Sequence, residues 1–101
     1  MKIILDNIIF SLQRSGGISN VWFEFIYRIM RKSNIELSFL DFKNQNIFFQ
    51  KLPKNNYPTN ITHSKRLIER YRNPQLENIN QKFIFHSSYY RTCNNSNAIN
   101  I

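Results

Sequence analysis

Residues 2–6 read Lys-Ile-Ile-Leu-Asp, and this short apolar run ending in an acid is the stretch that decides the fold. A strand covered on both of its faces shows no polar alternation, so the run predicts a buried strand of a parallel sheet. Residues 7–17 then form a polar loop that ends on Gly16-Gly17. Residues 18–32 follow with apolar side chains at helical spacing, which predicts an amphipathic helix.

The predicted helix separates its residue types into two faces. Its apolar face holds Ile18, Trp22, Phe25, Ile26 and Ile29, and its polar face holds Asn20, Glu24, Arg28 and Lys32. Residues 35–42 are again apolar and predict a second strand. Strand, helix and strand with short connections form a βαβ unit, whose two strands lie parallel.

The rest of the chain alternates in the same way. The predicted segments are a short strand at 47–49, a loop marked by Pro53 and Pro58, a basic helix that Thr62 caps and that runs to about Arg72, a buried strand at 82–85, a polar loop at 86–97, and a strand that begins at 98–101. This order predicts an α/β domain, a Rossmann-like parallel sheet with flanking helices. Because the pattern stops within a strand, we expect a partial chain.

The composition sets limits on the function. A chain of 101 residues suffices for one small domain. The net charge of +8 favours acidic partners, namely nucleic acid, anionic lipid or phosphorylated ligands, and the alternative is a solvated basic face. Cys93 is the only cysteine, so no internal disulfide forms, which suits a reducing cytoplasm. We interpret the frequent asparagines as a coding bias.

Two predicted loops follow the carboxyl ends of strands, at residues 7–17 and 86–97. In open α/β sheets, ligands bind at that edge. The first loop leads into a helix N-terminus, which attracts phosphate, and Gly16 and Gly17 would let the backbone approach a ligand closely. The alternative for Gly16-Gly17 is a tight turn with no ligand.

Several side chains in these loops are candidate ligand contacts. His86 suits a sugar hydroxyl or a phosphate, or else it is a partly buried histidine bonded to backbone. Tyr89 and Tyr90 suit stacking on a ligand or packing in the core. Arg14 and Arg91 suit pairing with a phosphate, or else they are exposed to solvent.

Other chemistry is less well supported by the residues. Asp6 is a possible base by position, but an acid at a strand end often makes a structural bond to a neighbouring loop. His63, His86 and Cys93 show no recurring metal-ligand spacing, so no metal site is predicted. No serine or cysteine lies in a nucleophile motif.

Two segments together resemble a known family. Ile3-Ile4-Leu5-Asp6, then Gln13-Arg14-Ser15-Gly16-Gly17-Ile18-Ser19 and Trp22-Phe23-Glu24, resemble the start of a retaining GT-B glycosyltransferase of family 4. Phe85-His86-Ser87-Ser88-Tyr89-Tyr90-Arg91 resembles a segment after a later strand of the same domain, and Ala98-Ile99-Asn100-Ile101 resembles the strand that follows it.

The resemblance implies a partial N-terminal, acceptor-side domain over residues 1–101, without the C-terminal donor domain. It implies transfer of a sugar from a nucleotide-diphosphate sugar, which is a substrate and not a cofactor, to a polysaccharide or lipid-linked acceptor. The implied donor or phosphate contacts are Gly16 and Gly17, and the implied acceptor contacts are Arg14, His86, Ser88, Tyr89 and Arg91. The catalytic residues are unknown, and we expect the fragment to be inactive alone.

The resemblance also bears on location and partners. It implies a cytoplasmic protein, peripheral at the inner face of the cell membrane, where the basic segment from Lys65 to Arg72 would contact anionic lipid. Two alternatives stay open. One is a small basic module that binds nucleic acid, which the charge favours but no sequence motif supports. The other is an inactive truncated remnant.

Overall fold

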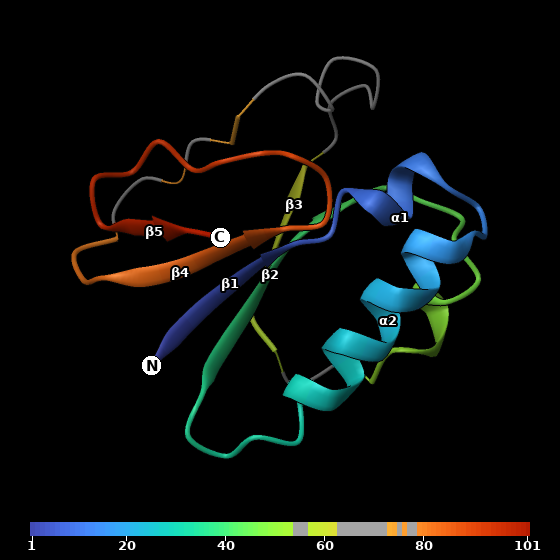
Figure 1. The fold of residues 1–101 in the computed structure, drawn as a ribbon, viewed down its shortest axis with the longest axis horizontal. Helices are drawn as coiled ribbons and strands as arrows, with labels where there is room; N and C mark the ends of the chain where they lie inside the picture. The colour runs from blue at the N-terminus through green and yellow to red at the C-terminus, as the bar shows by residue number, and fades with distance from the viewer. Residues whose placement is uncertain (54–56, 63–72, 75, 77–78) are drawn as a thin grey trace.

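The computed structural model describes residues 1–53, 57–62, 73, 74, 76 and 79–101 (Figure 1). Its centre is a sheet of five strands in the order β3-β2-β1-β4-β5, and every neighbouring pair is parallel. The strands are β1 (Lys2–Asp6), β2 (Glu36–Phe42), β3 (Thr59–Thr62), β4 (Phe83–Ser87) and β5 (Ala98–Asn100). The prediction of a parallel α/β sheet is confirmed, and this strand order is consistent with a Rossmann-like fold.

The first strand lies in the middle of the sheet, and it is buried, as its apolar run predicts. Ile4 is opposite Ser38 on one side and Phe85 on the other, so both backbone edges of β1 are paired. Leu5 and Asp6 have no exposed surface. A strand paired on both edges and covered on both faces favours apolar side chains, which explains the continuous apolar run from Ile3 to Leu5.

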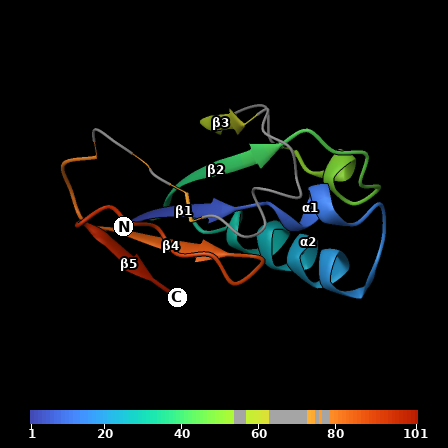
Figure 2. The same cartoon turned by 90° about the horizontal axis from the view of Figure 1, so that it is seen from above.

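Of the two α-helices that the structure describes, the longer one runs along one face of the sheet, and the shorter one directly follows the end of β1 (Figure 2). The longer helix, α2 (Gly17–Ile29), buries Trp22 and Ile26 against the sheet. A one-turn helix, α1 (Ile9–Leu12), occupies part of the segment predicted as loop. On the other face of the sheet a second apolar cluster gathers around Phe83 and Phe85.

The predicted apolar face of α2 is wrong at its first position. Ile18 is 55 % exposed, whereas Trp22 and Ile26 are buried. The helix begins beyond the ends of the strands, so its first turn has no sheet beneath it, and Ile18 lines a pocket there instead. The four predicted polar positions, Asn20, Glu24, Arg28 and Lys32, are all exposed.

The predicted strand at 47–49 is also wrong. The segment instead contains the 3-10 helix η1 (Phe49–Lys51). The buried side chain of Asn46 explains this turn, because its Oδ1 accepts the backbone N–H groups of Phe48 at 2.8 Å and Phe49 at 3.1 Å. An asparagine that bonds to the backbone in this way competes with strand pairing.

The third strand is β3, which begins directly after the predicted loop, at a place where no strand was predicted. The carbonyl of Pro58 accepts the N–H of Phe39 at 3.0 Å and brings the chain alongside β2. Thr62, the predicted helix cap, is the last residue of β3. The predicted basic helix from there to Arg72 lies outside the described residues.

The later strand predictions are close to the structure. β4 continues two residues past the predicted end at Phe85 and includes His86 and Ser87. β5 covers three of the four residues predicted at 98–101. Among the described residues, no helix has the length and apolar character needed to cross a membrane.

Candidate ligand site at the strand ends

The two predicted ligand loops meet at the carboxyl edge of the sheet. From β1 the chain adds β2 and β3 on one side, whereas β4 and β5 lie on the other side. The strand order therefore reverses between β1 and β4, and at such a point the loops diverge and leave a crevice. The loop before α2 follows β1, and the loop that contains Ser88 follows β4.

A pocket of about 360 Å³ lies at this point. Its lining is formed by the first turn of α2, the end of β4 with the loop after it, and the residue that follows β5: Ile18, Ser87, Ser88, Tyr89, Tyr90, Arg91 and Ile101. Three of the predicted acceptor contacts, Ser88, Tyr89 and Arg91, are thus brought together. Arg14 and His86 are not among the residues that line the pocket.

A buried ion pair holds the floor of the site. Arg91 donates from Nε to Oδ2 of Asp6 and from Nη2 to Oδ1, each at 2.8 Å. The guanidinium lies 4.9 Å from the centre of the Phe42 ring, and Arg91 is only 3 % exposed. Of the two alternatives for Asp6, the structure shows the bond to a neighbouring loop. The alternative of an exposed Arg91 is wrong, because Asp6 draws its side chain into the sheet edge.

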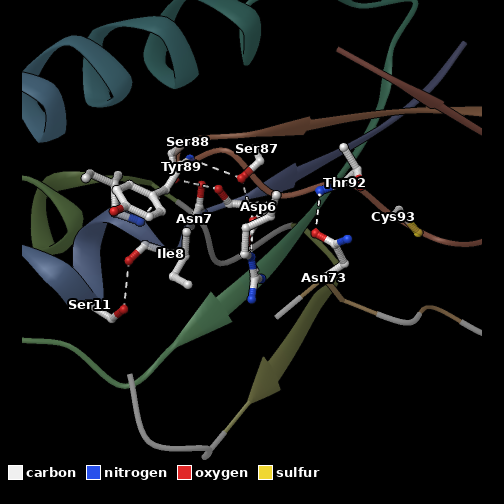
Figure 3. Close-up of polar contacts among 12 residues, drawn as sticks. Asp6, Asn7, Ile8, Ser11, Asn73, Ser87, Ser88, Tyr89, Thr92 and Cys93 are labelled. Carbon is white, nitrogen blue, oxygen red and sulfur yellow. Dashed lines mark hydrogen bonds and ion pairs between the residues drawn. The ribbon is translucent and has the colours of Figure 1, made fainter. Parts of the chain in front are cut away.

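Two serines complete the bonding around Asp6 (Figure 3). Ser87 donates its hydroxyl to Oδ2 of Asp6 at 2.7 Å, and Ser88 donates its hydroxyl to the Asp6 carbonyl at 2.7 Å. The Ser88 hydroxyl in turn accepts the N–H of Ile9 at 3.0 Å. These bonds tie the loop after β4 to the end of β1 and to the start of α1.

A second buried network lies directly beside the first. Asn7 donates from Nδ2 to Oδ1 of Asp41 at 2.7 Å and accepts the indole N–H of Trp22 at 2.8 Å. It therefore joins the ends of β1 and β2 to the middle of α2. Neither Asn7 nor Asp41 was a sequence candidate, and the only signal was the position of each polar residue at the end of an apolar strand.

The glycine loop is shaped by Gln13. Its side-chain Oε1 accepts the backbone N–H of Ser19 at 3.3 Å, in the first turn of α2. A Cβ on Gly16 would lie 2.6 Å from this Oε1, so the absence of a side chain on Gly16 allows the cap. A Cβ on Gly17 would meet nothing within 4 Å. Gly17 is thus exposed at the N-terminus of a helix, where backbone N–H groups lack partners within the helix.

His86 lies beneath α2. Its ring centre is 5.1 Å from that of Trp22 and 5.3 Å from that of Phe25, both in edge contacts. Burial lowers the pKa of His86 below its usual 6.5, because the charged imidazolium loses solvation there. Arg14 is exposed in the loop before α2, and its carbonyl accepts the N–H of Ile47 at 3.0 Å.

Comparison of the chain with protein-family models, curated proteins and solved structures finds no match. Within the described part of the chain, no three His, Cys, Asp or Glu side chains gather as they would around a metal ion. Any account of function therefore depends on the geometry of the strand-end site.

Proposed function

We propose that this chain is the N-terminal, acceptor-side part of a retaining glycosyltransferase of the GT-B type. The enzyme would move a sugar from a nucleotide-diphosphate sugar to a polysaccharide or lipid-linked acceptor, at the cytoplasmic side of the membrane. The supporting observation is that two segments far apart in the sequence, joined by the bonds of Asp6 to Arg91 across 85 positions, meet around one pocket. These are the same two segments that carry the family resemblance.

The donor side of the proposed site is the start of α2. Gly17 is open to solvent, and Ile18 beside it lines the pocket. Peptide dipoles and backbone N–H groups at a helix start favour a negatively charged group such as a diphosphate. The Gln13 side chain already bonds the N–H of Ser19, so a diphosphate would approach the turn through Gly17.

The acceptor side is the loop after β4. Tyr89 and Ser88 line the pocket, and Arg91 lies in its floor. Because the carboxylate of Asp6 neutralises the positive charge of Arg91, we assign Arg91 the role of positioning the loop. We keep His86 and Arg14 as predicted acceptor contacts of the complete enzyme, although neither lines the pocket.

The proposed chemistry depends on placement. Holding the acceptor hydroxyl and the sugar in reacting geometry reduces the entropic part of the barrier. Stabilising the charge that develops on the leaving diphosphate lowers it further, and the helix N-terminus would contribute to this. The reacting groups themselves would belong to the donor domain of the family.

Gly17→Trp tests the donor side. A Cβ at position 17 meets nothing within 4 Å, so the indole is attached at an open point of the helix start, where it would cover the approach to the turn. The gene product that contains this sequence is assayed for transfer from a panel of radiolabelled nucleotide sugars. We expect wild-type transfer from at least one donor and about a hundredfold loss in Gly17→Trp, because misplacing the reacting groups by an ångström has an effect of that size.

The matched control is Glu24→Trp, which places the same indole on the exposed side of α2. This variant should retain wild-type transfer. Equal activity in Gly17→Trp and wild type would remove the glycine loop from the donor site. No transfer by the wild-type protein from any donor would favour the inactive remnant.

The charge supports one competing function, nucleic-acid binding. A net charge of +8 on 101 residues attracts any polyanion. Binding that neutralises phosphates weakens steeply as salt rises. A titration of single-stranded RNA and duplex DNA at increasing salt therefore separates the two functions. Tight, salt-sensitive binding without sugar transfer would favour the nucleic-acid module.

A further inference from the structure

Tyr90 has an unusual backbone and an unusual exposure. Its φ is 41°, the only positive φ at a non-glycine residue in the described part of the chain. Its side chain is 96 % exposed, more than any other large apolar or aromatic residue described. A left-handed tyrosine is unfavourable and persists only where its surroundings impose the conformation.

The two neighbours of Tyr90 impose it. On one side, the N–H of Tyr89 donates to the hydroxyl of Ser87 at 3.0 Å. On the other side, Arg91 is fixed by its two bonds to Asp6. The chain must connect these fixed points with one residue, so it turns outward at Tyr90 and directs the ring into solvent.

The exposed ring stands at the rim of the pocket. Tyr90 meets Tyr89 with ring centres 5.2 Å apart and ring planes 69° apart, so the two rings form a corner. Tyr89 also packs against the apolar cluster beneath it, which fixes one side of the corner. Ile18 and Ile101 line the pocket as well. The pocket therefore offers flat aromatic and aliphatic surfaces.

The charge of the pocket selects the kind of ligand. Arg91 is the only charged residue in the lining, and the negative carboxylate of Asp6 neutralises it. A phosphate would gain little from such a site. A pyranose suits it better, because one face of the ring presents C–H groups for an aromatic surface and the rim presents hydroxyls. A volume of about 360 Å³ is sufficient for one such ring.

We propose that Tyr90 is a binding and specificity residue that stacks on a neutral pyranose ring held in the pocket between the start of α2 and the loop after β4. This inference rests on the proposed function, in which the pocket takes the acceptor. It adds a residue and a ligand class: an uncharged sugar ring, bound through its face.

The test compares Tyr90→Asn and Tyr90→Phe with the wild-type chain. Asparagine adopts a positive φ readily, so it removes the ring without adding strain. Phenylalanine keeps the aromatic face. The probes are the methyl glycosides of glucose, galactose, mannose and N-acetylglucosamine, with uridine diphosphate as a donor-side probe. Binding is followed by saturation-transfer NMR and by amide shifts in ¹⁵N-labelled protein.

We expect at least one glycoside to bind and to shift the amides of Tyr89 and Tyr90. Tyr90→Asn should weaken that binding by about fivefold to tenfold, the range expected for a lost aromatic contact. Tyr90→Phe and the control Tyr27→Ala, which removes another exposed tyrosine ring from α2, should bind within about twofold of wild type.

The outcomes separate this inference from the proposed function. Glycoside binding that is unchanged in Tyr90→Asn would overturn the role of Tyr90 and leave sugar binding in place. Binding of uridine diphosphate without any glycoside would overturn the pyranose pocket and leave the donor loop in place. Binding of neither probe would count against both.

Discussion

Arg91 and Asp6 are joined by two bonds of 2.8 Å across 85 positions of sequence, and neither side chain has more than 3 % of its surface exposed. The pair joins the end of β1 to the loop after β4, at the point where the strand order reverses. It also fixes the end of the loop that presents Tyr89 and Tyr90. The stability of the domain and the shape of the pocket therefore depend on the same ion pair.

Removing one partner of this pair should be strongly destabilising. Arg91→Ala leaves the carboxylate of Asp6 buried without its cation, which typically costs about 3–5 kcal/mol. We expect a loss of that size in the free energy of unfolding, measured by urea denaturation. Arg28→Ala, which removes an exposed arginine from α2, should change stability by less than about 0.5 kcal/mol.

The double variant Asp6→Leu with Arg91→Met sharpens this prediction. It removes both charges together, so its loss should be smaller than the sum of the two single losses. Equal stability of Arg91→Ala and wild type would show that the pair contributes nothing in solution.

Replacing Asn7 should lower the free energy of unfolding as much as truncating an apolar core residue does. Asn7→Ala leaves the indole N–H of Trp22 and the carboxylate of Asp41 each without one bond in a buried place. A buried polar group that loses its partner costs about 1–3 kcal/mol, so we expect a total of about 2–6 kcal/mol for the two groups. Urea denaturation followed by Trp22 fluorescence measures it. The control is Asn20→Ala on the exposed side of α2, which should not lower stability.

The roles of the asparagines show where sequence reasoning was limited. We interpreted their frequency as a coding bias, yet Asn7 and Asn46 are buried and direct the chain. Asn100 likewise accepts the N–H of Cys93 at 2.7 Å and donates to its carbonyl at 3.2 Å. Asn46 accepts N–H groups two and three residues further on, whereas Asn7 binds side chains far from it in the sequence. Composition alone could not separate these residues from exposed ones.

The fold was easier to predict than the site. A continuous apolar run requires burial on both faces, and this predicted a buried strand of a parallel sheet at residues 2–6. The short polar edge strand β3 carried no such signal, because its pairing with β2 depends on tertiary contacts. The two predicted loops lie at the strand ends, although α1 occupies part of the first and β4 extends into the second. Whether Arg91 faced solvent or Asp6 depended on a contact across the chain.

The burial of His86 should make stability depend on pH. Its pKa is lowered in the folded chain, so the unfolded chain binds the proton more readily as the pH falls below about 6.5. The contribution of His86 to stability is therefore complete above its unfolded pKa. It decreases as the pH falls through the window between 6.5 and the lower folded pKa.

Urea denaturation of wild type and His86→Gln from about pH 8 to about pH 5 tests this direction. Wild type should lose more stability on acidification than His86→Gln, because glutamine has no proton to gain. The comparison cancels the titration of every other group that the two proteins share. A parallel decline in both would show that His86 does not titrate differently in the folded state.

Gln13 and Gly16 should act as one unit at the start of α2. Gln13→Ala removes the acceptor for the N–H of Ser19, and losing such a cap costs about 0.5–2 kcal/mol. In Gly16→Ala the new Cβ would lie 2.6 Å from Oε1 of Gln13 and displace the same acceptor. We expect both single variants to lose stability and to speed hydrogen exchange at the Ser19 amide.

The double variant distinguishes a shared cap from two separate effects. If Gly16→Ala acts by displacing Gln13, adding it to Gln13→Ala should lower the free energy of unfolding only slightly further. Gln50→Ala, which shortens an exposed glutamine in η1, is the control and should leave the Ser19 amide unchanged. Fully additive losses would mean that the alanine at position 16 strains the turn by itself, so that the glycine is required for a reason other than the Gln13 cap.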